Sequence, residues 1–246
     1  MTSRAPDSDG VVLSLRDVAK SFGGIRALDG LDLDVARGEI VGVIGPNGAG
    51  KTSLFDVMSG LQHPDTGKIT FAGTRIERLP AHRIARLGLA RTMQAAGVFV
   101  DLTVMENLRL AATWTPVRGR TFVDRAEMLL EQTRLTAHAT IAAGRLSYGQ
   151  QRLVEFAMAV MGRPSLVLLD EPAAGVNPVL IDRITELILT VHEEGTTFMI
   201  VEHNVPFVMG VSTRMVAMAQ GRKIADGSVE QVRNDPLVLE HYLSGG

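Results

Sequence analysis

A glycine-rich stretch, Gly45-Pro46-Asn47-Gly48-Ala49-Gly50-Lys51-Thr52, carries most of the information about the fold of this chain. It fits the pattern G-x-x-x-x-G-K-[ST], in which glycines let backbone N–H groups curl around phosphate oxygens. The lysine reaches the β- and γ-phosphates, and the hydroxyl is a ligand for Mg²⁺. The stretch follows the apolar run Ile40 to Ile44 and precedes a helical pattern over residues 54–61. We therefore predict a phosphate-binding loop between a buried strand and a helix.

A second apolar run, Leu166 to Leu169, ends in the two carboxylates Asp170 and Glu171. Beside a bound phosphate chain, the first carboxylate can hold Mg²⁺ through water and the second can polarise the attacking water. A strand that ends by chance in surface acids has the same appearance when it stands alone. Together with the phosphate loop, the pair favours nucleotide hydrolysis.

Length and composition fit one large α/β domain, with 246 residues of which 46% are hydrophobic. The formal charge of −2 argues against a global field that attracts nucleic acid or anionic lipid. Without cysteine, the chain has no disulfide, thiolate metal site or cysteine nucleophile, and a reducing compartment is the default expectation. No apolar run approaches the roughly 18 residues of a membrane-spanning helix.

The hydrophobic periodicity divides the chain into regions. Residues 1–10 are expected to form a disordered leader, and residues 11–246 a single domain. Strands are expected at 12–35, where Leu31, Leu33 and Val35 alternate with aspartates, and at 68–73, 166–169 and 196–201. A helical lobe is expected at about 95–162, with a capping box at Thr103 and Glu106, a helix over 122–133 and another opening at Ser147. A further helix is expected at 179–194.

The segment Leu146-Ser147-Tyr148-Gly149-Gln150-Gln151-Arg152 resembles the signature motif of ATP-binding cassette (ABC) ATPases. Other matches follow in family order: Phe22 at the adenine-stacking position, Gln94 in the Q-loop, Ala173 to Asn177 in the D-loop, and His203 as the switch histidine. The resemblance covers nearly the whole chain. It implies a P-loop NTPase fold of the ABC nucleotide-binding type, with a RecA-like core, an N-terminal antiparallel β subdomain and an inserted helical lobe.

The resemblance also implies ATP and Mg²⁺ as cofactors and a role for each matched residue. The catalytic set is Glu171, His203, Gln94 and Lys51, and the metal-binding set is Thr52, Gln94 and Asp170. The nucleotide-binding set comprises Phe22, Gly45, Pro46, Asn47, Gly48, Ala49, Gly50, Lys51, Thr52, Ser53, Ser147, Gly149 and Gln150.

The segment after Ser147 has the chemistry of an incomplete anion site. Ser147 is a suitable N-cap, and its hydroxyl with the N–H groups from Gly149 onward resembles a phosphate loop without a lysine. In ABC ATPases two subunits meet head to tail, so this loop is expected to close on the γ-phosphate of a partner subunit. Tyr148 and Asn177 depart from the commonest family wording, and Asn177 keeps hydrogen-bonding capacity without charge.

Three further segments resemble ATP-binding subunits of branched-chain amino acid importers: Glu171 to Pro178, Val201 to Asn204, and Asp235 to Leu243. Urea and short-amide importers share these sequence motifs, and lipopolysaccharide-extraction ATPases have similarly short chains. A soluble ABC ATPase acting on ribosomes or DNA is the remaining alternative. Such soluble proteins carry two cassettes in one chain or long inserted coiled coils. This chain shows neither feature, which disfavours a soluble role.

The resemblance implies a second ATPase subunit, two membrane permease subunits and an extracytoplasmic solute-binding protein as partners. The chain is then expected at the cytoplasmic face of the inner membrane, attached through the permeases. The docking groove is expected around residues 94–110. The arginine-rich segment Arg75 to Arg91 is interpreted as a solvated face rather than a nucleic-acid site, because no aromatic residues interleave it.

Overall fold

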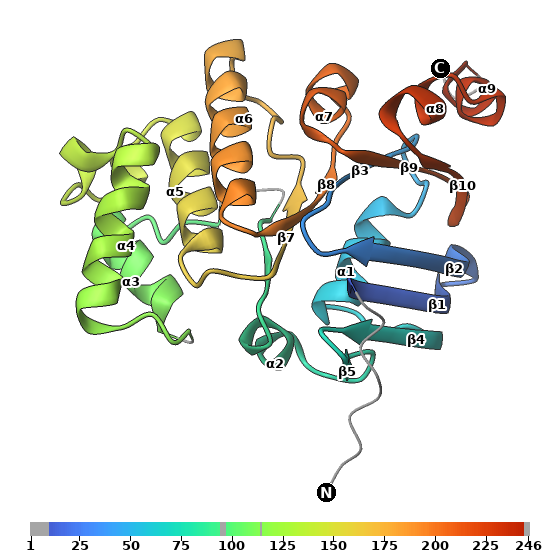
Figure 1. Cartoon of the computed structure of the whole chain (residues 1–246), viewed down its shortest axis with the longest axis horizontal. Coiled ribbons are helices and arrows are strands. Elements are labelled where there is room, and N and C mark those ends of the chain that lie inside the picture. The colour runs from blue at the N-terminus through green and yellow to red at the C-terminus, as the bar shows by residue number, and fades with distance from the viewer. Residues whose placement is uncertain (1–9, 94–96, 114, 244–246) are drawn as a thin grey trace, which may run out of the picture.

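A computed structural model describes residues 10–93, 97–113 and 115–243. Its larger sheet has six strands in the order β10-β9-β3-β8-β7-β6 (Figure 1). The strands are β3 (Ile40–Ile44), β6 (Leu89–Arg91), β7 (Leu166–Asp170), β8 (Thr197–Val201), β9 (Arg214–Ala219) and β10 (Arg222–Gly227). All neighbouring strands pair in parallel, apart from the β9–β10 hairpin, which is antiparallel. Every residue of β3, β7 and β8 is buried, which confirms the interpretation of these apolar runs as strands covered on both faces.

The second sheet is antiparallel, in the order β2-β1-β4-β5. It contains β1 (Val11–Phe22), β2 (Ile25–Ala36), β4 (Thr66–Phe71) and β5 (Thr74–Arg75). The expected strand at 68–73 is therefore displaced by two residues. Ala72 and Gly73 have φ angles of 46° and 74°, so they form the turn into β5 rather than the end of a strand.

Helices pack on both sides of the six-stranded sheet (Figure 1). They are α1 (Lys51–Ser59), α2 (Ala81–Arg86), α3 (Val104–Ala112), α4 (Gly119–Gln132), α5 (Tyr148–Val160), α6 (Pro178–Glu193), α7 (Val205–Val211), α8 (Val229–Arg233) and α9 (Pro236–Leu243). Helices α3, α4 and α5 lie together at one end of the molecule, and the antiparallel sheet lies at the other (Figure 1). Both expected caps are present, at Thr103 and Ser147, while α4 begins three residues earlier than its hydrophobic pattern suggests.

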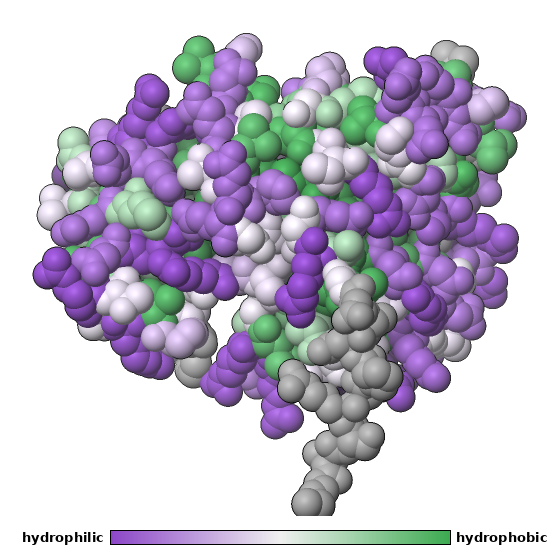
Figure 2. All heavy atoms as spheres, in the orientation of Figure 1, coloured by the Kyte–Doolittle hydropathy of each residue, from purple (hydrophilic) through white to green (hydrophobic). Residues whose placement is uncertain are grey.

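Two apolar clusters form the core. One joins the side chains of α3, α4, α5 and α6 to one face of the six-stranded sheet, and the other fills the space between the two sheets and α1. The polar loops that follow β3, β7 and β8 are consequently held by strands with apolar packing on both faces. Figure 2 shows hydrophilic side chains over most of one face, with a group of hydrophobic ones over α7.

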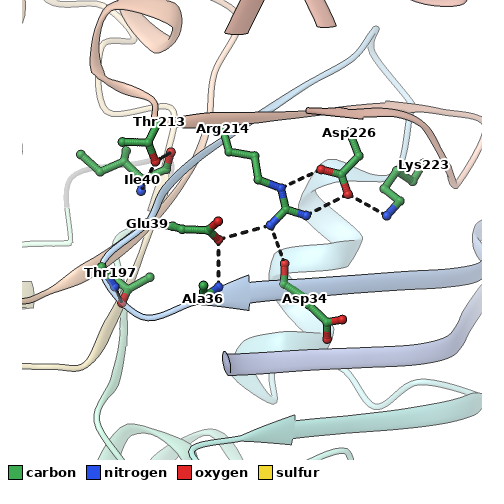
Figure 3. A network of polar contacts seen from close by, with 10 residues as sticks. Asp34, Ala36, Glu39, Ile40, Thr197, Thr213, Arg214, Lys223 and Asp226 are labelled. Atoms are coloured by element: carbon green, nitrogen blue, oxygen red, sulfur yellow. Dashed lines mark hydrogen bonds and ion pairs between the residues drawn. The ribbon is translucent and has the colours of Figure 1, made fainter. Parts of the chain in front are cut away.

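A polar network around Arg214 braces the two sheets against each other (Figure 3). Its guanidinium forms two hydrogen bonds to Asp226 of β10, at 2.7 and 2.8 Å, and donates to the carbonyl of Asp34 in β2 at 2.9 Å. It also lies 3.2 Å from the Glu39 carboxylate, which accepts from the Ala36 N–H at 2.8 Å. One side chain thus fixes the β2–β3 turn to the β9–β10 hairpin. Among the described residues, none of the helices is both long and apolar enough to cross a membrane.

Candidate active site

The glycine-rich loop leaves the end of β3 and enters α1 in a conformation that needs glycine. Gly45 and Gly50 have φ angles of 156° and 101°. A methyl group on Gly45 would lie 2.3 Å from the Met218 carbonyl oxygen, and one on Gly50 would lie 2.3 Å from that of Ala27. Gly48 has a φ of 78° but faces open space. The loop is therefore packed against backbone at both ends and open in the middle, as a phosphate cradle requires.

Lys51 is the first residue of α1, and its side chain turns back into the loop. It is buried, and its ammonium donates to the carbonyls of Gly45 at 2.6 Å and Pro46 at 3.0 Å. Burial lowers the pKa of Lys51, and the nearby carboxylates of Glu171 and Asp170 offset part of this shift. A phosphate chain that enters the loop would bring further negative charge to this buried cation.

Asp170 is the last residue of β7 and is almost fully buried. Its Oδ2 lies 2.9 Å from the Arg91 guanidinium, and its N–H donates to the Thr92 hydroxyl at 3.2 Å. Burial raises the pKa of Asp170, although Arg91 acts in the opposite direction. Arg91 had been expected on a solvated face, and that expectation is wrong for this residue. Its side chain is only 8% exposed, and a second ion pair, with Asp56 of α1 at 2.7 Å, helps to satisfy its buried charge.

Glu171 and His203 meet although they are far apart in the sequence. Their Oε1 and Nε2 atoms are 3.1 Å apart. They follow the neighbouring parallel strands β7 and β8, whose carboxyl ends lie at the same edge of the sheet. Glu171 has a φ of 49°, unusual for a residue with a Cβ atom, and its N–H donates to the Val201 carbonyl at 2.9 Å. The bend turns its carboxylate toward the histidine.

Glu202, a residue that the sequence motifs do not single out, organises this edge of the sheet. Glu202 is buried and accepts the N–H groups of Ala173, His203 and Asn204 at 2.6, 2.9 and 3.0 Å. It therefore fixes the turn after β8 to the loop after β7. The only signal in the sequence is a carboxylate next to a predicted switch histidine, which is too little to identify its role.

Ser147, Gly149 and Gln150 lie in another groove, of about 800 Å³, lined also by Asn177 and the first turns of α6. Ser147 and Gln150 form a reciprocal capping box: the Ser147 hydroxyl accepts the Gln150 N–H at 3.3 Å, and the Gln150 side chain accepts the Ser147 N–H at 3.0 Å. Lys51, Asp170 and Glu171 do not line this groove. The expected nucleotide-binding residues of one chain therefore lie in two separate places.

The remaining expected residues differ in how the structure places them. Phe22 is the last residue of β1, is 43% exposed, and has the Lys20 ammonium 5.2 Å from its ring centroid. Thr52 is exposed and Ser53 half-buried in the first turn of α1. Gln94 lies outside the described residues. Asn177 caps α6 by accepting the Leu180 N–H at 3.0 Å, a role that asparagine and aspartate fill equally well.

Comparison with known proteins identifies the class. Residues 28–174 match the sequence profile described as "ABC transporter", and the chain belongs to this family. The structure resembles the ADP conformation of MJ1267, an ATP-binding cassette of an ABC transporter, with a TM-score of 0.85 and 32% identity over 95% of this chain and 98% of that one. The expected fold class is confirmed, and the chain is an ATP-binding, ATP-hydrolysing subunit.

The comparisons also point to one branch of the family. Residues 222–243 match a second profile, described as "Branched-chain amino acid ATP-binding cassette transporter". The chain is 38% identical to the high-affinity branched-chain amino acid transport ATP-binding proteins BraF of Pseudomonas aeruginosa and LivG of Escherichia coli (strain K12). Each alignment covers 94% of this chain and 97% of its relative.

Proposed function

We propose that this chain is the ATP-hydrolysing motor subunit of an importer for branched-chain amino acids. The observation that carries the proposal is the match of residues 222–243 to a profile specific for this transporter group, in addition to the general ABC profile. The general match leaves urea, amide and lipopolysaccharide systems open. The C-terminal segment favours branched-chain amino acids among them.

In the proposed reaction, the loop from Gly45 to Ser53 holds the phosphates of ATP through backbone N–H groups at the start of α1. Lys51 exchanges its loop carbonyls for the β- and γ-phosphate oxygens. Glu171 polarises the attacking water, and His203, 3.1 Å away, holds its carboxylate and contacts the γ-phosphate. The half-exposed ring of Phe22 stacks on adenine.

The oxygen donors at this site suit Mg²⁺ rather than a softer metal. The described residues contain no cluster of three histidine, aspartate, glutamate or cysteine side chains able to hold a metal on their own. The ion would therefore be held by the Thr52 hydroxyl, by Asp170 through water and by the phosphates, with Gln94 as a further ligand. When bound, Mg²⁺ neutralises charge on the phosphates and favours departure of the leaving group.

A second ATPase subunit is required because each half-site is incomplete. Ser147 and its helix start face a groove that contains no lysine or paired carboxylates of the kind that follow β7. In a head-to-tail dimer, the Ser147 loop of one subunit closes on the γ-phosphate held by Lys51 of the other. ATP binding then closes the dimer, and hydrolysis reopens it.

We place the docking surface for a permease subunit beside the 94–110 segment. Met93, Phe99 and Val100 are each about half exposed. Met93 lines a groove of about 330 Å³ between α2, β6, α3 and α5, and Phe99 and Val100 follow another of its lining residues, Gly97, along the chain. Exposed apolar side chains next to a preformed groove fit an apolar helix of a membrane subunit. Through two such permeases, with an extracytoplasmic solute-binding protein, the chain would sit at the cytoplasmic face of the inner membrane.

The test is uptake of radiolabelled leucine in source cells that carry either the wild-type chain or Glu171→Gln. We expect Glu171→Gln to lower turnover by about 100-fold or more, the scale of losing a positioned general base. Leucine uptake should then be lost, and in wild-type cells unlabelled isoleucine and valine should compete where urea does not. Wild-type leucine uptake in the mutant would refute the branched-chain cargo, and near-normal ATP turnover by the purified variant would refute the role of Glu171.

A further inference from the structure

Two buried charged residues on α5 take no part in the chemistry described above. Arg152 and Glu155 form an ion pair at 2.8 Å, and their side chains are only 3% and 7% exposed. Burying two charges is costly unless each is paired and hydrogen-bonded. The contacts that satisfy this pair lead to the segments that follow the neighbouring strands β6 and β7.

The first set of contacts is with Met93, two residues after the edge strand β6. The Met93 N–H donates to Glu155 at 2.9 Å, and the Met93 carbonyl accepts from Arg152 at 3.0 Å. The ion pair thus satisfies both the N–H and the carbonyl of Met93, which in a sheet would be paired with a neighbouring strand. The Gly97 N–H also donates to the Glu155 carboxylate, so the pair holds both residues that flank positions 94–96.

The second contact is with the backbone of Glu171. The other terminal nitrogen of Arg152 donates to the Glu171 carbonyl at 2.7 Å, and the Glu171 N–H is bound by Val201 of β8. The left-handed φ of 49° at Glu171 is unfavourable for a residue with a Cβ atom and persists only where the surroundings fix it. Hydrogen bonds to both backbone groups of Glu171 provide that constraint. Its carbonyl also accepts the Ala174 N–H at 3.1 Å, so Arg152 supplies one of the three bonds, and the one that comes from helix α5.

We propose that Arg152 is a positioning residue for Glu171. Its hydrogen bond to the carbonyl holds the bend that aims the Glu171 carboxylate at His203 and the attacking water, while Glu155 fixes the guanidinium. Arg152 lies between one and two turns after Ser147 on the same helix. Movement of the Ser147 loop onto a partner subunit therefore moves the group that holds Glu171. The proposal rests on the catalytic role given to Glu171 above.

Glu155 also lines the proposed permease groove, together with Met93 and Gly97. An element bound in that groove would contact the carboxylate that fixes Arg152. The route from groove to Glu171 consists of two side chains and three charge-assisted hydrogen bonds, all within the described residues.

The test compares Arg152→Lys and Arg152→Gln in the native complex, isolated through a tag on this chain. Lysine keeps the charge beside Glu155. Its single ammonium cannot replace the two guanidinium nitrogens that reach the carbonyls of Met93 and Glu171. We expect both variants to lower kcat for ATP about tenfold or more, with KM changed less than twofold, since a small misplacement of a reacting group costs about this much. Adding either change to Glu171→Gln should alter the residual rate less than twofold.

Arg125→Gln is the matched control, because Arg125 of α4 is as buried as Arg152 and also bonds to a glutamate, Glu194, and to a carbonyl, that of Val160 at the end of α5. It should leave kcat within about twofold. Unchanged kcat in both Arg152 variants would overturn the proposal, as would an equal fold loss with and without Glu171. If Glu171→Gln alone kept its turnover, the proposed function of Glu171 would fail instead.

Discussion

At the scale of single residues, two glycines of the phosphate loop have the same kind of left-handed backbone conformation but different surroundings. Both Gly48 and Gly50 have positive φ angles, but only Gly50 is packed against another carbonyl oxygen. Replacing Gly48 by alanine should therefore report only the backbone strain of the left-handed conformation. Replacing Gly50 should report that strain together with a steric clash. The two positions are only two residues apart, so the comparison holds the surroundings nearly constant.

We expect Gly48→Ala to lower the free energy of unfolding by about 1–2 kcal/mol, the cost of a left-handed conformation for alanine. Gly50→Ala should lose about 3 kcal/mol or more, because its methyl would also lie 2.3 Å from the Ala27 carbonyl oxygen. Urea unfolding of the nucleotide-free chain measures both values. Equal losses would mean that the loop shifts to accept the methyl group at Gly50.

At the scale of elements, the start of α5 is a capped helix end for which we also propose a role in binding the partner subunit's nucleotide. The chain offers a second helix start with the same design, since Ser228 and Gln231 form a capping box at α8. Its bonds match those of Ser147 and Gln150 in kind and length. The two serines therefore differ in their surroundings: Ser147 lines the groove that also contains Asn177, and Ser228 does not.

Ser147→Ala and Ser228→Ala should each lower the free energy of unfolding by about 1 kcal/mol, the usual value of an N-cap side chain. Only Ser147→Ala should weaken the ATP-dependent dimer, measured by size-exclusion chromatography in the Glu171→Gln background, while ATP binding to the monomer is retained. A normal dimer in Ser147→Ala would show that the hydroxyl serves the helix alone.

Within the proposed docking surface, the backbone of residues 99–107 is held by a buried side chain of its own. The side chain of Asn107, fully buried, accepts the Phe99 N–H at 2.8 Å and donates to the carbonyls of Phe99 and Thr103 at 3.0 and 2.9 Å. Phe99→Glu should leave this backbone in place, because the ring itself is half exposed. The substitution then tests the surface rather than the fold.

We expect Phe99→Glu, alone or with Leu102→Glu, to abolish co-sedimentation of the chain with membranes while ATP binding stays intact. Burying a carboxylate in an apolar contact without a partner is strongly unfavourable. Val123→Glu on α4, where the valine is 40% exposed, is the control and should have no effect. Membrane association that survives the Phe99 and Leu102 changes would refute this docking surface.

At the scale of the whole molecule, the network around Arg214 joins the two sheets (Figure 3). Burial alone would raise the pKa of Asp226, but hydrogen bonds from Arg214 and Lys223 outweigh burial and lower the pKa below its ordinary value. A carboxylate with a lower pKa in the folded chain stabilises the fold above its unfolded pKa of about 3.9. This contribution is lost as the pH falls through the lower folded value.

Asp226→Asn should therefore lower the free energy of unfolding at pH 7 by about 1 kcal/mol, a value reduced by the partial exposure of the side chain. The difference from wild type should persist down to about pH 4 and shrink below it. Urea unfolding at several pH values measures this. Asp29 is the control, because its side chain is about as exposed as that of Asp226 but its partners Arg26 and Arg222 are about two-thirds exposed, so solvent screens their charges more than that of Arg214. Asp29→Asn should have a smaller effect at every pH. A pH-independent loss in Asp226→Asn would contradict the ion-pair explanation.

Sequence alone determined the parts of this protein whose chemistry depends on neighbours along the chain. The phosphate loop, the strand that ends in Asp170 and Glu171, and the caps at Thr103 and Ser147 each lie within a few residues, so local pattern and backbone geometry specify them. The resemblance to ABC ATPases then supplied His203, which by itself is an uninformative histidine. The fold class followed from the same motifs and is confirmed.

Only the tertiary structure decided which buried charges hold the site together. Arg91 stands in an arginine-rich segment that suggests a solvated face, yet it lies between Asp56 and Asp170. Arg152, Glu155 and Glu202 likewise bind backbone groups of residues that are adjacent in space because strands β6, β7 and β8 are neighbours in the sheet. A charged residue has no periodicity that reveals its partner. The order of the strands supplies that information, and it exists only once the chain has folded.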